Sequence, residues 1–336
     1  MPDDALDPAL PQDLARPAAH PQDPSAADGV SWVQTHISHV FLTGARVVKL
    51  RKAVRLSFLD FGTRAARIED ARREVRLNRR LAPDVYLGLA PVRPGADGRY
   101  QVGAVDEAPE PGAPPPEHAV VMRRLPDGCD ARSMLARGAL APRHLDAVAD
   151  VLARFHADHG LGAPAPWSAE AWWARTAGPM RANFESLRES PPEGIDRDRV
   201  EETARATEER LTARAPALER RREAGRAVDG HGDVHLEHVW FERDDAEPLL
   251  IDCIEFSDDL RRIDAASEVA FLAMDLAYRE RGDLAARFLR SYAARSDDYG
   301  LFEVVDLFAA YRAAVRAKVA ALAAGEEEVE PAQRRA

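Results

Sequence analysis

Short apolar runs separated by turn residues fill the chain as far as about residue 122. The segments VSWVQTH, HVFLTGARVVKLRKAV, DVYLGLAPVRP and EHAVVMRRL are enriched in Val, Leu, Phe and Tyr and are broken by Gly, Pro or Asp. This texture is typical of antiparallel strands and hairpins. One helix is expected among them, over 63–82, because Thr63 can cap it and apolar residues follow at helical spacing. The pattern predicts a small antiparallel sheet with a single helix.

Beyond Pro126 the apolar residues recur mostly at helical spacing. Helices are predicted at about 143–159, 168–188, 196–222, 263–281, 284–295 and 302–323, and the strand-like residues 238–253 among them are expected to form a hairpin. The proline-rich stretch 106–118 is predicted to be a loop within the sheet. We therefore expect an α+β chain, with a sheet-based N-terminal lobe over 29–122 and a larger, mainly helical C-terminal lobe over 123–324.

The two termini carry most of the net charge. Residues 1–28 hold six Asp and one Arg, and residues 325–336 hold four Glu and two Arg, so these segments account for −7 of the total of −11. The first is rich in Pro, Ala and Asp and is predicted to be a disordered tail, and the second is predicted to be a charged tail. The residues between them are nearly balanced in charge, which argues against a nucleic-acid partner.

Membrane and disulfide chemistry are not expected. The first residues lack the basic start and apolar block of a signal peptide, and no apolar run reaches the roughly 18 residues that a membrane helix needs. We predict a cytoplasmic protein without a membrane partner. The two cysteines, Cys129 and Cys253, are far apart and lack CxxC spacing, so neither a disulfide framework nor a thiolate zinc site is predicted.

The segment HGDVHLEHVWF, residues 231–241, concentrates chemically active side chains. An acid follows a histidine by two residues on a tight turn, and Asp252 lies at the end of the next predicted strand, LLID. In phosphoryl transfer, one carboxylate accepts the proton of the attacking hydroxyl, and a second holds the magnesium that neutralises the phosphates. Asp233 and Asp252 are the candidates for these two roles.

The segments HGDVHLEHV and LLIDCIEF resemble the catalytic and metal-binding segments of the aminoglycoside phosphotransferase and choline kinase-like families, over about residues 30–324. A bacterial branch of uncharacterised members, often fused to a P-loop ATPase domain, is similar in HVFLTGARVVKL, EVRLNRRLAPDVYLG, IDCIEF and VAFLAMDL. The resemblance implies a two-lobed protein-kinase-like fold, ATP or GTP as donor, Mg2+, and a small-molecule hydroxyl as acceptor. No GxxxxGK(S/T) phosphate loop occurs in this sequence, so a functional link to a P-loop ATPase is an expectation only.

The resemblance also implies roles for individual residues. A strand lysine should hold the α- and β-phosphates and a helix glutamate should hold the lysine, and Lys49 and Glu74 fit. Glu74 is chosen over Glu69 because the positions three and four residues away from it on the helix hold no cation. The remaining implied roles are phosphate contacts by Thr35 and Ser38 in a hairpin without glycine, purine recognition by the backbone near Met122 and Leu125, and bracing of the catalytic turn by His231 and Asp264.

His238 stands where kinases usually place an asparagine that binds magnesium. Imidazole is a poor magnesium ligand, so Asp252 is expected to hold the ion with help from Glu255 and water, unless His238 contacts phosphate or a softer metal. Two alternatives remain open. One is a nucleotide-binding pseudokinase with a regulatory role. The other is a metal-dependent hydrolase whose candidate ligands are His231, Asp233, His235, His238 and Asp252.

Overall fold

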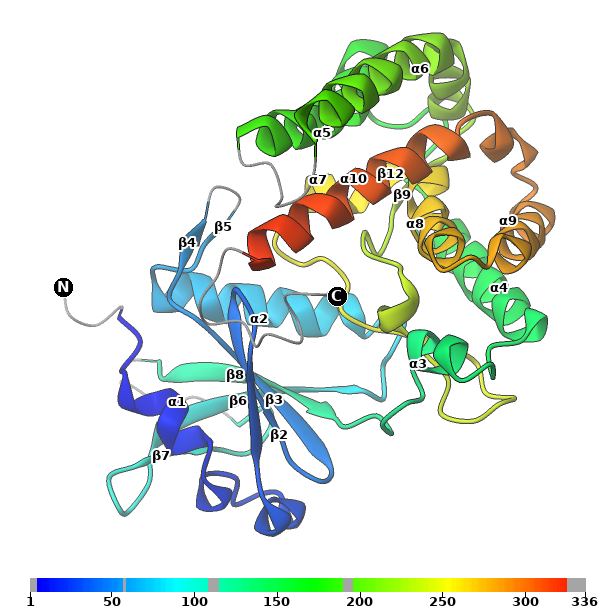
Figure 1. Ribbon diagram of the computed structural model, residues 1–336. Helices are drawn as coiled ribbons and strands as arrows, with labels where there is room; N and C mark the ends of the chain where they lie inside the picture. The colour runs from blue at the N-terminus through cyan, green and yellow to red at the C-terminus, as the bar shows by residue number, and fades with distance from the viewer. Residues whose placement is uncertain (1–4, 57–58, 108–114, 190–195, 325–336) are drawn as a thin grey trace. The chain divides into compact units, whose positions relative to one another are not determined.

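The computed structural model describes residues 5–56, 59–107, 115–189 and 196–324. The chain divides into two compact units, Met1–Asp127 and Gly128–Ala336, both drawn in Figure 1. The division therefore falls a few residues later than the predicted boundary at residue 122. The second predicted tail, 325–336, lies outside the described residues.

The first unit is built on an antiparallel sheet in the order β1-β2-β3-β8-β6-β7. Its strands are β1 (Ser31–Gln34), β2 (Ser38–Leu42), β3 (Arg46–Arg51), β6 (Tyr86–Pro94), β7 (Tyr100–Val102) and β8 (Glu117–Arg123), and a separate short hairpin pairs β4 (Arg55–Leu56) with β5 (Leu59–Asp60). The predicted sheet is confirmed, although β7 and the short hairpin were not expected. The predicted loop 106–118 overlaps the first residues of β8, and its residues 108–114 lie outside the described part.

Helix α2 (Arg64–Asn78) packs on one face of this sheet, against β8 and β6. It begins as predicted, because the Thr63 hydroxyl accepts a hydrogen bond from the Ala66 amide at 3.2 Å. Side chains alternate between the two faces along β3. Lys49 lies on the face of α2, while its neighbours Val48 and Leu50 are buried on the opposite face.

The opposite face of the sheet is covered by the N-terminal segment. Helix α1 (Ala9–Leu14) is followed by the 3₁₀ helices η2 (Pro17–Ala19) and η3 (Pro24–Asp28). Leu10 and Leu14 are buried in a cluster with Phe41, Val48 and other residues of the sheet. The predicted disorder of residues 1–28 is therefore wrong for the described residues 5–28, because a few leucines suffice to bury an otherwise acidic segment on an apolar face.

The second unit is mainly helical, as predicted. Its helices are α3 (Ala131–Ala136), α4 (Pro142–Asp158), α5 (Ala169–Glu189), α6 (Arg197–Glu223), α7 (Asp258–Arg261), α8 (Ala265–Tyr278), α9 (Gly282–Ser296) and α10 (Val305–Ala324), with the 3₁₀ helices η4 (Leu236–His238) and η5 (Tyr299–Glu303). The six predicted long helices correspond to α4, α5, α6, α8, α9 and α10, whereas α3 and α7 were not predicted. Within the described ranges, every helix is too short or too polar to cross a membrane.

Two small strand pairs in this unit position the candidate site. The predicted hairpin is present as β10 (Val239–Trp240) paired with β11 (Leu249–Leu250). A second pair, β9 (Ala227–Asp229) with β12 (Arg262–Asp264), was not predicted because each strand has only three residues. Helix α8 is almost entirely buried beside the second pair, with contacts to β12, η4, α9 and α10.

Candidate functional site

In the first unit, Lys49 and Glu74 form the predicted pair. The Lys49 Nζ atom lies 2.7 Å from Glu74 Oε1, and the Glu74 side chain is fully buried. Glu69, the other candidate on α2, is exposed and lies 3.8 Å from Arg72 of its own helix. A glutamate without a local cation on the buried face of a helix requires a tertiary partner, and here β3 supplies it.

Arg51, which the sequence reasoning missed, shares this glutamate. Its guanidinium donates to Glu74 Oε2 at 2.6 Å, to Asp70 Oδ2 at 2.7 Å and to the Ser38 hydroxyl at 2.8 Å. Lys49 and Arg51 lie two residues apart on β3 and therefore share a face, so one buried carboxylate can hold both cations. The signal available in the sequence was the spacing of Arg51 two residues after Lys49 on one predicted strand.

The predicted phosphate hairpin uses its hydroxyls locally. Thr35 Oγ1 accepts a hydrogen bond from the Ser38 amide at 3.0 Å, and the Thr35 amide donates to the Ser38 carbonyl at 2.9 Å. These bonds close the turn between β1 and β2 without glycine. The Ser38 side chain is buried against Arg51. The contacts of Thr35 and Ser38 with phosphate remain predictions.

The predicted purine-recognition segment follows directly from β8. Met122 and Leu125 are both buried. Between them, the Arg123 amide donates to the Val85 carbonyl and the Arg124 amide donates to the Ala45 carbonyl, each at 2.8 Å. These bonds fix the path of the backbone, and its contact with a purine remains a prediction.

In the second unit, the acid-bearing turn is held by a residue that the sequence reasoning missed. The two carboxylate oxygens of Glu268 accept hydrogen bonds from the amides of His231, at 2.6 Å, and Gly232, at 2.9 Å. Gly232 has a φ of 87°, a conformation that glycine adopts at no steric cost. Burial alone would raise the pKa of Glu268, but His156, His231 and the Gly232 amide lower it to about 2.

Helix α8 holds both ends of the turn. Asp275 lies seven residues after Glu268, on the same side of the helix, and its Oδ2 accepts a hydrogen bond from the Leu236 amide at 3.0 Å. Arg312 of α10 donates to the Gly232 carbonyl at 3.1 Å. Asp264 does not brace the turn as predicted. It caps α8 through the Ala266 amide and forms a buried ion pair with Arg221 at 2.7 Å.

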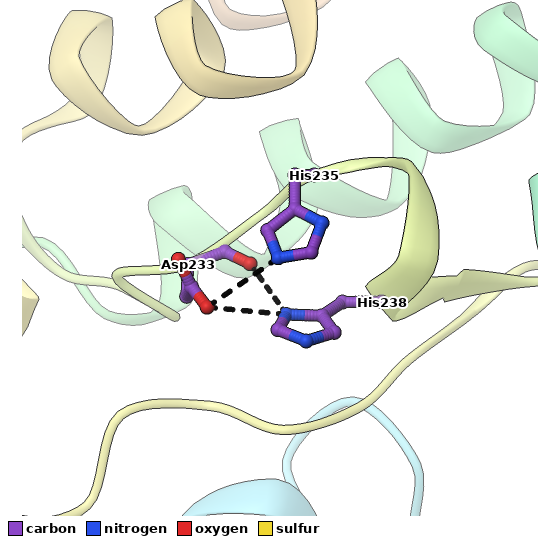
Figure 2. Close-up of side chains that lie close together, drawn as sticks. All are labelled: Asp233, His235 and His238. Carbon is purple, nitrogen blue, oxygen red and sulfur yellow. Dashed lines mark hydrogen bonds and ion pairs between the residues drawn. The ribbon is translucent and has the colours of Figure 1, made fainter. Parts of the chain in front are cut away.

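The backbone sets the tautomers of the three histidines around Asp233. A carbonyl can only accept, so His231 Nε2 donates to the Ile251 carbonyl at 2.9 Å and His238 Nδ1 donates to the Asp233 carbonyl at 2.8 Å. An amide can only donate, so His235 Nδ1 accepts from the Glu237 amide at 3.4 Å and its proton is on Nε2. His235 Nε2 and His238 Nδ1 then face Asp233 Oδ2, at 3.6 and 3.4 Å, as Figure 2 shows.

This arrangement favours the ionised form of Asp233. Burial by itself would raise the pKa of Asp233, but His235 and His238, with His231 behind them, hold it well below its usual range. Burial lowers the pKa of His231 to about 4 and also lowers the pKa of His238. At neutral pH the turn therefore presents a carboxylate surrounded by N–H groups, with about a third of its side chain exposed. Such a group can accept a proton or orient a hydroxyl.

Asp252 lies next to His238 because of the hairpin register. Val239 pairs with Leu250, and the Ile251 amide donates to the His238 carbonyl at 3.0 Å. Asp252 has a φ of 64°, which is uncommon for a residue with a Cβ. Its half-exposed side chain has Oδ2 3.6 Å from His238 Nε2. The metal role of Asp252 remains a prediction, and so does that of Glu255, which is buried.

Of the ligands considered for a metal-dependent hydrolase, Asp233, His235 and His238 come together. One potential ligand atom of each lies within 4.8 Å of the others, and within the described ranges this is the one such group of three. His231 points its Nε2 at a backbone carbonyl instead. Because His235 Nε2 and His238 Nδ1 both carry protons, neither nitrogen has a lone pair to offer a metal.

Proteins of related sequence match most of the chain. Uncharacterized proteins of Mycobacterium tuberculosis and Mycobacterium bovis are 35% identical to it over 286 residues, which is 85% of this chain and 53% of theirs. The chain thus spans about half the length of the curated relatives it matches. The predicted link to a P-loop ATPase is supported by none of these matches and remains a prediction.

Solved structures of kinases are similar over much of the chain. An ethanolamine kinase of Plasmodium vivax has 11% identity and a TM-score of 0.47, with 88% of this chain and 75% of that chain covered. A choline/ethanolamine kinase family protein of Mesorhizobium loti has 13% identity and a TM-score of 0.47, covering 97% and 92%. An aminoglycoside phosphotransferase of Streptomyces rimosus has 18% identity and a TM-score of 0.41, covering 84% and 95%.

The family model described as the phosphotransferase enzyme family matches residues 43–305. The match contains β3 with Lys49, α2 with Glu74, the acid-bearing turn and Asp252, and it covers well over half of the chain. The resemblance found in the sequence is thereby confirmed, and the chain belongs to the phosphotransferase enzyme family.

Proposed function

We propose that this protein transfers the γ-phosphoryl group of ATP or GTP to a hydroxyl group of a small molecule. The observation that supports this best is the position of Asp233, an ionised and accessible carboxylate on a turn whose backbone is fixed by Glu268, in a member of a phosphotransferase family. Phosphoryl transfer depends mainly on positioning and on charge stabilisation, and a rigid turn serves both.

The charged residues of the predicted site and His238 have separate roles in this proposal. Asp233 orients the acceptor hydroxyl and accepts its proton as the oxygen attacks the γ-phosphorus. Lys49, held by Glu74, contacts the α- and β-phosphates of the donor. Asp252 and His238 would hold a divalent metal, which when bound neutralises phosphate charge. One carboxylate oxygen and one imidazole nitrogen are a donor set that a divalent cation accepts, and water and phosphate oxygens can complete it.

The proposal is tested by Asp233→Asn. Phosphoryl transfer to an added acceptor should fall by about 10²- to 10⁴-fold, the usual contribution of a general base, while nucleotide affinity changes by no more than a few-fold. Asp245→Asn, which alters an exposed acid in the loop between β10 and β11, is the matched control. Full turnover in the Asp233 variant would remove the proposed base. A panel of hydroxylated metabolites, assayed with ATP and with GTP, supplies the acceptor for this measurement.

The alternative candidate function is that of a nucleotide-binding pseudokinase with a regulatory role. The observation that favours it is His238, an imidazole at a position where the resemblance expects an asparagine. Purified protein that binds nucleotide but neither hydrolyses it nor transfers its phosphate, with any divalent metal, would support this alternative. Metal-dependent turnover would support the phosphotransferase.

A further inference from the structure

His238 presents an unprotonated ring nitrogen to Asp252. The Asp233 carbonyl accepts a hydrogen bond from His238 Nδ1 at 2.8 Å, so in the neutral ring the lone pair is on Nε2. That atom lies 3.6 Å from Asp252 Oδ2. A histidine that binds a metal commonly donates its second ring N–H to a backbone carbonyl in this way, because the bond fixes the ring and its tautomer.

The distance itself suits two ligands of one ion. A hydrogen bond between nitrogen and oxygen would bring the atoms to about 2.7–3.2 Å. Two donor atoms that each lie about 2.0–2.2 Å from the same ion are separated by about 2.8–3.6 Å, from the octahedral to the tetrahedral angle, and the 3.6 Å between His238 Nε2 and Asp252 Oδ2 lies at the upper end of this range. The register of β10 and β11 and the hydrogen bond from the Ile251 amide to the His238 carbonyl hold His238 and Asp252 at this distance.

We propose that His238 Nε2 and Asp252 form a mixed nitrogen and oxygen site that selects a divalent transition metal, such as Mn2+ or Co2+, over Mg2+. The inference rests on the proposed function in that it takes this ion to be the partner of the donor phosphates. Magnesium favours an all-oxygen shell, whereas an imidazole ligand adds affinity along the series from Mn2+ to Co2+. The histidine therefore changes the metal preference of the site and does not mark its loss.

A site made of Asp233, His235 and His238 is the competing geometry. It would require protons to leave His235 Nε2 and His238 Nδ1, and it would break the bond from His238 to the Asp233 carbonyl. The pair of His238 Nε2 and Asp252 requires neither change. The two geometries also differ in composition, since the competing one contains two imidazole nitrogens and the proposed one contains a single nitrogen.

The experiment is electron spin-echo spectroscopy of Mn2+ bound to the full chain. Inorganic triphosphate replaces the nucleotide, because it contains no nitrogen that could couple to the metal. We expect ¹⁴N modulation from one imidazole ring. The signal should disappear in His238→Asn and persist in His235→Asn, the matched control on the same turn. Wild-type protein that binds Mn2+ without ¹⁴N coupling, or with coupling to two imidazole rings, would overturn the proposal.

Calorimetry gives a second, independent readout. The ratio of Mn2+ to Mg2+ affinity, and that of Co2+ to Mg2+, should each fall by at least about tenfold in His238→Asn, because the amide oxygen replaces nitrogen with a ligand that magnesium accepts. Unchanged ratios would contradict the inference. Neither measurement needs an acceptor or turnover, so a failure of the metal assignment is distinct from a failure of the phosphotransferase assignment, which Asp233→Asn tests.

Discussion

At the scale of single residues, Lys49 and Glu74 give the sharpest expectation. Lys49→Ala should lower kcat/KM for the nucleotide by about 100-fold, on the order of 2.7 kcal/mol, because it removes the proposed charge on the phosphates. Lys52→Ala, three residues along the same segment, is the control and should change this value little. Steady-state kinetics with varied nucleotide measures both, and equal kcat/KM in the two variants would contradict the role of Lys49.

Glu74→Gln should behave differently from Lys49→Ala because Glu74 also holds the buried Arg51. Its effect on kcat/KM should be smaller, since Lys49 remains. Its effect on the free energy of unfolding should be larger than that of Lys49→Ala. The buried guanidinium of Arg51 loses the charge of Glu74 and keeps Asp70 as its other described carboxylate partner. A urea titration of both variants beside the kinetics separates positioning of the lysine from support of the fold.

Glu268 predicts a specific dependence of stability on pH. Its folded pKa of about 2 is below its ordinary value of 4.5, so its contribution to the free energy of unfolding is complete above about pH 4.5 and is lost as the pH falls toward 2. The shift corresponds to an effect on the order of 3 kcal/mol. Glu268→Gln should therefore be less stable than wild type at pH 7, with the difference narrowing between about pH 5 and 2.

Denaturant unfolding across this pH range provides the measurement. Glu209→Gln, which alters an exposed glutamate on α6, is the control and should leave the pH profile unchanged. A constant difference between wild type and Glu268→Gln from pH 7 to pH 2 would show that the carboxylate charge does not stabilise the turn.

At the scale of elements, the N-terminal segment is part of the fold of the first unit. Leu14 is fully buried between α1 and the sheet. Leu14→Ala should therefore lower the free energy of unfolding by about 2–5 kcal/mol, through lost burial and the cavity left behind. Val33→Ala, at an exposed position on β1, is the control and should cost much less. Equal unfolding midpoints in the two variants would show that α1 does not stabilise the sheet.

At the scale of the whole molecule, binding of nucleotide should raise the temperature of unfolding. A ligand that binds only the folded chain stabilises it by about 2.7 kcal/mol at a concentration 100 times its Kd. ATP with a divalent metal should therefore raise Tm more than ATP alone, and Asp252→Ala should remove the metal-dependent part. Asp245→Ala, at an exposed aspartate of the same hairpin, should keep it. A full metal-dependent shift in Asp252→Ala would exclude Asp252 as the proposed ligand.

The sequence by itself determined the order of the main sheet strands and the six long helices, and the residues of the acid-bearing turn. Short runs enriched in Val, Leu, Phe and Tyr and broken by Gly, Pro or Asp mark the sheet, and helical spacing marks the six long helices, because each of these elements has apolar residues that must be buried. The choice of Glu74 over Glu69 was also available, because no cation lies three or four residues from Glu74 on its helix. Residue type and near neighbours are sufficient for inferences of this kind.

Only the tertiary structure decided which distant residues support these side chains. Glu268 accepts hydrogen bonds from amides that lie 36 or more positions away in the sequence. Arg51 of β3 pairs with Glu74 of α2. Asp264 was expected to brace the turn, but it caps α8 instead. Residues 5–28 are likewise folded because they pack on a face of the sheet, which their own composition does not reveal. The tautomer of His238 depends on the position of one backbone carbonyl. For Glu268, Arg51 and residues 5–28 the stabilising partner lies far along the chain, and a linear pattern does not record which groups folding brings together.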